Sequence, residues 1–83
     1  MIEINQSSQT INIGTITKNP TVAEITQITD TLAAHFGGQW FAVKLSGYWL
    51  VYLKGSQTRR AQYRGNFHRA LADATGLTVV AVN

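Results

Sequence analysis

Hydrophobic residues recur at helical spacing between residues 21 and 36, and polar residues occupy the opposite side of that stretch. The apolar stripe consists of Ile25, Ile28, Leu32 and Phe36. Thr21 and Glu24 have the spacing of a capping box, in which each side chain bonds a free backbone N–H at the start of a helix. Because two glycines follow Phe36, the pattern predicts an amphipathic helix that ends there.

Period-two alternation predicts strands on both sides of this helix. Ile2–Asn5 has the composition of a short strand, and in Thr10–Ile16 isoleucines alternate with polar residues. At the other end of the chain, Leu77–Val82 is rich in β-branched residues and predicts a closing strand.

Two alternating segments, residues 40–45 and 48–54, predict a β-hairpin whose register decides which side chains share a face. A two-residue turn at Ser46-Gly47 would pair Leu45 with Tyr48 and leave both faces apolar. A three-residue loop would pair Lys44 with Tyr48 and gather Phe41, Val43, Trp49, Val51 and Leu53 on one buried face. We favour the second register, which leaves an open face that includes Trp40, Lys44, Tyr48, Tyr52 and Lys54.

A second helix is expected from about Thr58 to Thr75, where Gly76 would end it. Its core stripe would be Tyr63, Phe67, Ala70, Leu71 and Ala74. The resulting order is βαββαβ, with an extra N-terminal strand as an option. Two right-handed crossovers joined by a hairpin predict an α+β, two-layer ferredoxin-like sandwich, with one antiparallel sheet and both helices on one of its faces.

The 83 residues are enough for one domain, spanning 1–83, and the 45% of hydrophobic residues is enough for a small core. The chain has no cysteine, which excludes disulfides and favours a reducing compartment. The first residues lack the pattern of a signal peptide, and no apolar run approaches the roughly 20 residues that span a bilayer. We therefore expect a soluble, cytoplasmic protein without a membrane partner.

The charge of the chain is divided unevenly. Residues 1–38 carry a net charge of −2, whereas residues 39–83 carry +5 and contain Asp73 as their single acid. Five of the cations in this second part are Lys44, Lys54, Arg59, Arg60 and Arg64, and aromatic residues are interleaved with them. Clustered cations attract polyanions or acidic partners. The sequence therefore predicts a binding surface.

Two candidate surfaces follow from the predicted fold. On the open sheet face, Trp40 and Tyr52 would offer stacking platforms for bases, and Lys44 and Lys54 would hold phosphates. The RNA recognition motif uses this topology and surface, but its aromatic signature is not met in residues 46–53, so the chain is not assigned to that family. The same face could instead be covered by the N-terminal residues or by a second copy of the chain.

The second surface is the start of the second predicted helix. Arg59 and Arg60 would lie in its first turn, where the helix dipole disfavours cations, so that stability does not account for them. Together with Lys54 and Arg64 they would suit a phosphate or a carboxylate, and Arg60, Arg64 and His68 would form a ladder along the helix. A solvated basic face without a ligand is the alternative.

No pattern of residues names an enzyme, a metal site or a cofactor. His35 and His68 are the only imidazoles, and neither has a carboxylate or nucleophile at catalytic spacing. The leading hypothesis is therefore a small non-enzymatic protein that binds nucleic acid, RNA or DNA, through its basic patch. The alternative is a protein-binding inhibitor or adaptor, similar in size to phage and mobile-element inhibitors such as anti-CRISPR proteins, that occupies an acidic or nucleic-acid-binding protein; a homodimer is a further option.

Overall fold

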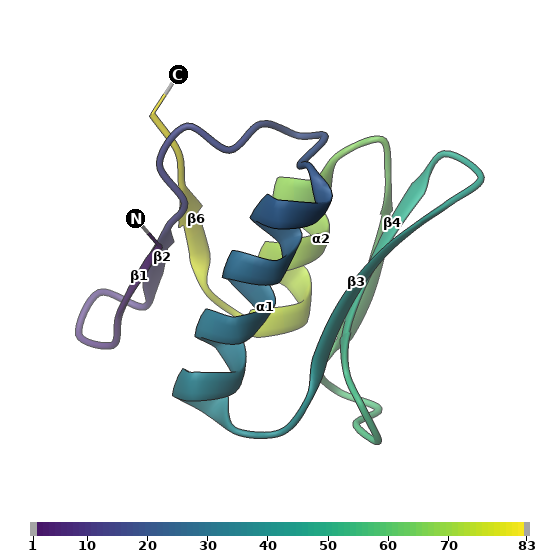
Figure 1. Ribbon diagram of the computed structural model, residues 1–83. Coiled ribbons are helices and arrows are strands. Elements are labelled where there is room, and N and C mark those ends of the chain that lie inside the picture. The colour runs from purple at the N-terminus through teal and green to yellow at the C-terminus, as the bar shows by residue number, and fades with distance from the viewer. Residues whose placement is uncertain (1, 83) are drawn as a thin grey trace.

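The computed structural model describes residues 2–82, in which two helices lie between two three-stranded sheets (Figure 1). The elements, in chain order, are β1 (Glu3–Asn5), β2 (Thr10–Asn12), α1 (Val22–Phe36), β3 (Trp40–Leu45), β4 (Tyr48–Leu53), β5 (Arg60–Arg64), α2 (Phe67–Thr75) and β6 (Thr78–Val80). The first sheet has the order β1-β2-β6, with β2 and β6 parallel, and the second has the antiparallel order β3-β4-β5.

The predicted α+β class, the first helix and the extra N-terminal strand are confirmed, but the single ferredoxin-like sheet is wrong. The error lies in residues 58–75, which do not form one helix. Arg60–Arg64 is a strand that pairs with β4, and α2 begins only at Phe67. As a result β5, the next segment along the chain, becomes the third strand of the sheet that contains the hairpin, and β6 pairs with β2 in a separate sheet.

The start of α2 explains why the second helix is shorter than expected. Gly65 has a φ of +67°, which most side chains disfavour and which ends β5. Asn66 then accepts a hydrogen bond from the backbone N–H of Arg69 and caps the helix. Gly65 is therefore a turn residue between strand and helix rather than a mid-helix glycine.

The first helix begins as the sequence predicts. The backbone N–H of Glu24 donates to Thr21 Oγ1 at 3.2 Å, and the backbone N–H of Thr21 donates to Glu24 Oε1 at 2.8 Å, which completes the capping box. Ile28 and Leu32 of its apolar stripe are fully buried. This helix packs against β3 on one side and β1 on the other.

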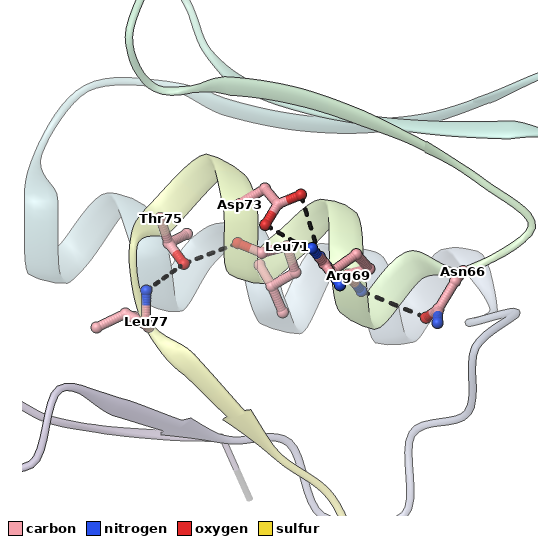
Figure 2. A network of polar contacts seen from close by, with 6 residues as sticks. All are labelled: Asn66, Arg69, Leu71, Asp73, Thr75 and Leu77. Atoms are coloured by element: carbon pink, nitrogen blue, oxygen red, sulfur yellow. Dashed lines mark hydrogen bonds and ion pairs between the residues drawn. The ribbon is translucent and has the colours of Figure 1, made fainter.

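The core lies around α2, which contacts β4 and β5 on one side and β6 on the other. Phe67 is fully buried and meets the ring of Trp49 edge-on, with the ring centroids 5.2 Å apart. Phe67 therefore joins the helix to the second sheet. The exposed side of α2 carries the ion pair of Arg69 and Asp73 at 3.3 Å (Figure 2).

The end of α2 is fixed by a buried hydroxyl. Thr75 Oγ1 donates to the carbonyl of Leu71 at 2.7 Å and accepts from the backbone N–H of Leu77 at 3.2 Å (Figure 2). Both hydrogen-bonding roles of this hydroxyl are thus used inside the protein, and the chain is directed from α2 into β6.

The hairpin of β3 and β4 adopts the register that the sequence analysis rejected. Leu45 pairs with Tyr48, and the turn consists of Ser46 and Gly47, with φ of +43° and +86°. Two consecutive positive φ angles are typical of the tight turn whose twist matches an antiparallel hairpin. The predicted three-residue loop is therefore wrong, and both faces of the hairpin are indeed rich in apolar residues.

Candidate binding face of the second sheet

The second sheet has one face against the helices and one face away from them, which we call the outer face. In the observed register the outer face consists of three rows that run across the strands, and each row contains one residue from each of β3, β4 and β5. The rows are Phe41–Tyr52–Arg60, Val43–Leu50–Gln62 and Leu45–Tyr48–Arg64. The opposite, inner face carries the buried Trp40, Trp49 and Val51.

The first row is a stack of planar groups across three strands. The rings of Phe41 and Tyr52 are nearly parallel, at 25°, with their centroids 5.2 Å apart. The guanidinium carbon of Arg60 lies 5.2 Å from the centroid of Tyr52. Because β3 and β5 flank β4 on opposite sides, Phe41 and Arg60 cover the two faces of the Tyr52 ring. The row therefore exposes ring edges, and its open stacking surfaces are at its two ends.

The third row also pairs an arginine with a tyrosine. The guanidinium carbon of Arg64 lies 4.5 Å from the ring centroid of Tyr48, and Arg64 Nη2 donates to the phenolic oxygen at 2.9 Å. Each arginine of β5 is thus placed against a tyrosine of β4 by a cation–π contact. These contacts restrict two long side chains that would otherwise sample many rotamers.

The outer face is positively charged and contains no acidic residue. Arg60 and Arg64 are four residues apart on an extended strand, which separates their Cα atoms by about 13 Å. Both side chains are exposed, and within residues 2–82 neither has a carboxylate inside 4 Å. The charge of the two guanidiniums is therefore free to act on a ligand.

Trp40 and Lys44 of the sequence-predicted site do not lie on this face, and Lys54 lies just beyond the end of its central strand. Trp40 is 4% exposed on the inner face, where its Nε1 donates to the carbonyl of Gly37 at 3.2 Å. Lys44 also belongs to the inner-face set and donates to Asn19 Oδ1 at 3.2 Å. Lys54 is exposed and follows β4 directly. The register error moved Trp40 and Lys44 to the wrong side of the sheet, because a shift of one residue exchanges the two faces.

The side chain of Arg59 contacts the helices, whereas that of the neighbouring Arg60 contacts Tyr52 on the outer face. The Arg59 side chain is half-buried, Nη1 donates to the carbonyl of Thr75, and the guanidinium carbon lies 4.6 Å from the ring centroid of Phe36. Arg59 therefore caps the C-terminal end of α2, where a cation is favoured. The predicted cluster at the start of a helix, and the ladder from Arg60 through Arg64 to His68, are both wrong because these residues are not on one helix.

Sequence reasoning missed Phe41 and Gln62 as outer-face residues. The signal was present in Arg60–Arg64, where Arg60, Gln62 and Arg64 alternate with Ala61 and Tyr63. Five residues fit the period of a strand and the period of a helix equally well. Because the apolar residues after Arg64 follow at helical spacing, the sequence predicts one continuous helix through this segment.

Comparison with known proteins found no matching family model, no similar curated protein and no similar solved structure. Neither helix in the described part of the chain is long and apolar enough to cross a membrane. Residues 2–82 also contain no group of three His, Cys, Asp or Glu side chains that could hold a metal ion. The outer face is therefore the feature of the described residues that bears on function.

Proposed function

We propose that this chain is a small, non-enzymatic protein that binds nucleic acid through the outer face of the second sheet. The observation that carries the proposal is the placement of Arg60 and Arg64, each held against a tyrosine on a face without acidic residues. Guanidiniums donate paired hydrogen bonds to phosphate oxygens and also stack on bases, so the same groups serve both parts of a nucleotide.

Single-stranded nucleic acid suits this surface better than a duplex. Bases of a single strand are free to stack on aromatic rings and on guanidinium planes. In the first row the open stacking surfaces are those of Phe41 at one end and Arg60 at the other, since Tyr52 is covered on both sides. A base therefore extends the row at its ends, and the guanidiniums contact the phosphates beside it.

The middle row adds a group that can read a base edge. Gln62 is exposed and lies between Arg60 and Arg64 on β5. Its amide offers both donors and an acceptor, which is the pattern that base edges require. Val43 in the same row is 37% exposed and supplies apolar contact area, whereas Leu50 is buried. In this proposal the arginines supply the affinity for the phosphates, and Gln62 supplies the preference for one base over another.

A protein partner is the second candidate, and the exposure of two apolar residues favours it. Val43 is 37% exposed and Leu45 is 49% exposed, both on the β3 side of the outer face. Apolar and aromatic residues beside arginine are typical of the centre of protein interfaces. An inhibitor or adaptor would use this face against an acidic or nucleic-acid-binding protein, and a second copy of the chain would cover the same residues. The cysteine-free composition suits the reducing cytoplasm for either partner.

Fluorescence anisotropy with labelled single-stranded RNA, single-stranded DNA and duplex DNA tests the proposal. We expect binding of a single strand that weakens as salt is raised, with each arginine–phosphate contact adding about −0.7 to the slope of log affinity against log salt. Absence of binding to all three probes at low salt contradicts the proposal. A pull-down then separates the alternatives, because a protein partner survives nuclease treatment and a nucleic-acid-mediated one does not.

A further inference from the structure

A cavity of about 580 Å³ lies apart from the outer face, where the ends of both helices approach the turn between β1 and β2. Its walls are formed by Gln6 and Gln9 of that turn, His35 and Phe36 of α1, Arg59 of the loop before β5, and residues 75–77 at the end of α2 and just after it. The volume is in the range of small-molecule sites, which occupy roughly 300–1,000 Å³. Each wall comes from a different part of the chain, so the cavity is a product of the tertiary fold.

Among residues 2–82, Arg59 is the only lining residue with a permanent charge, and its position is fixed. The ring of Phe36 supports the guanidinium plane at 4.6 Å, and the carbonyl of Thr75 accepts a hydrogen bond from Nη1. A guanidinium has five N–H donors, so most of them remain for a ligand. Because the side chain is already ordered, binding of a ligand does not incur the entropic cost of immobilising it.

The other polar groups of the wall complement the charge of Arg59. None of the lining residues in the described part of the chain is a carboxylate, and Gln6, Gln9 and His35 contribute amide and imidazole groups that can donate hydrogen bonds. The hydroxyl of Thr75 is not available to a ligand, because it donates to the carbonyl of Leu71 and accepts from the backbone N–H of Leu77 (Figure 2). The negative ends of the two helices, each equivalent to about half a charge, offset much of the charge of Arg59, so the attraction for an anion rests on directed hydrogen bonds from the guanidinium rather than on net charge.

We propose that this cavity binds a small organic anion, with a carboxylate or phosphate monoester on Arg59 and an apolar body against Phe36 and Leu77. The shared chemistry is an oxyanion that accepts two or more hydrogen bonds. This site does not depend on the function proposed for the outer face. Arg59 contacts Phe36, whereas the neighbouring Arg60 contacts Tyr52 on the outer face, so the two arginines serve different surfaces.

Isothermal titration calorimetry with benzoate, phenyl phosphate and the neutral benzamide tests this proposal. We expect the two anions to bind at least about tenfold more tightly than benzamide, because only they form charge-assisted hydrogen bonds with Arg59. The better of the two anions identifies the ligand class as a carboxylate or a phosphate monoester. Arg59→Gln should abolish this preference, and Arg60→Gln, which removes the same charge from the outer face, should leave it unchanged.

Arg59 also caps α2, so an amide chemical-shift titration of the wild-type protein provides a test that does not need the variant. Benzoate should shift the backbone amides of Gln6, Gln9, Gly76 and Leu77 and leave those of Gln62 and Arg64 in place. Equal affinity for benzoate and benzamide, shifts confined to the outer face, or no shift at millimolar benzoate would each overturn the proposal. A protein that binds no nucleic acid but passes this test would contradict only the function proposed for the outer face.

Discussion

Arg64 is held by Tyr48 in two ways at once, through a guanidinium carbon 4.5 Å from the ring centroid and a 2.9 Å hydrogen bond from Nη2 to the phenolic oxygen. The same strand places Arg60 against Tyr52 at 5.2 Å. Two arginines of an edge strand are thus positioned by two tyrosines of the central strand. This arrangement stores little folding energy, since exposed cation–π contacts contribute about 0.5–1 kcal/mol each, but it fixes two charges on a face without acids.

Replacing both arginines should remove nucleic-acid binding without unfolding the protein. In Arg60→Gln, Arg64→Gln the strand keeps its length and polarity, and the free energy of unfolding should change by no more than about 1–2 kcal/mol, the sum of two exposed cation–π contacts. Loss of two phosphate contacts should make the salt slope of binding to a single strand shallower by about 1.4. Anisotropy titrations at several salt concentrations measure both quantities.

Arg69→Gln is the matched control for that variant. Arg69 is also exposed, but it lies on α2 and pairs with Asp73 at 3.3 Å. The substitution lowers the net charge of the protein as each outer-face substitution does, and an exposed i,i+4 pair contributes only about 0.5 kcal/mol to stability. If Arg69→Gln weakened binding as much as Arg64→Gln, net charge rather than the outer face would account for the affinity.

The phenolic oxygen of Tyr48 should matter less than its ring. Tyr48→Phe keeps the aromatic surface under Arg64 and removes only the hydrogen-bond acceptor, so we expect binding to weaken less than in Arg64→Gln. Tyr48→Leu removes both contacts and should approach the loss seen in Arg64→Gln. Direct comparison of the three affinities at one salt concentration checks the order, and an unchanged affinity in Tyr48→Leu would show that the positioning of Arg64 is unimportant.

The hairpin turn offers a test of the register. Gly47 has a φ of +86°, and the added Cβ of Gly47→Ala would meet Arg64 Nη1 only at 3.7 Å, an ordinary contact. The cost is therefore conformational, about 1–2 kcal/mol, which for a domain of this size lowers the melting temperature by roughly 4–16 °C. Ser46→Asn should instead be neutral or stabilising, because Asn-Gly is the preferred pair for this turn. A destabilising Ser46→Asn would contradict the observed register.

Arg59 should be a determinant of stability, unlike the exposed cations. Arg59→Ala loses the hydrogen bond to the carbonyl of Thr75 and the contact with Phe36, and we expect it to lower the free energy of unfolding by about 1–3 kcal/mol. Lys54→Ala removes a nearby exposed cation and should have an effect within about 0.5 kcal/mol. Urea unfolding of both variants measures the difference, and equal stabilities would show that Arg59 does not cap α2.

The first helix could be predicted from the sequence because its signals are local. Thr21 and Glu24 cap it, and Ile28 and Leu32 repeat at its own period, so no distant residue is needed to decide its position. The short strands near the two ends could be located for a similar reason. Their pairing could not, because the parallel contact of β2 with β6 depends on how the rest of the chain folds between them.

The candidate site was predicted in part. Arg60, Arg64 and Tyr52 do share a surface, but the sequence analysis placed the arginines on a helix and Tyr52 beside Trp40. The segment Arg60–Arg64 is too short for its period to decide between helix and strand, and its pairing with β4 settles the choice. For the hairpin, apolar residues on both faces argue from the sequence against the observed register, but Val43 and Leu45 are exposed on the outer face, as is typical of a binding surface.

The most direct test of the central claim is an amide chemical-shift map of the labelled protein titrated with a short single-stranded oligonucleotide. We expect salt-sensitive shifts at Arg60, Gln62 and Arg64 of β5 and at Tyr48 and Tyr52 of β4, with α1 unaffected. Shifts spread over the exposed side of α1, or none at all at an oligonucleotide concentration that saturates other single-strand-binding proteins, would contradict the assignment of the outer face as a nucleic-acid-binding surface.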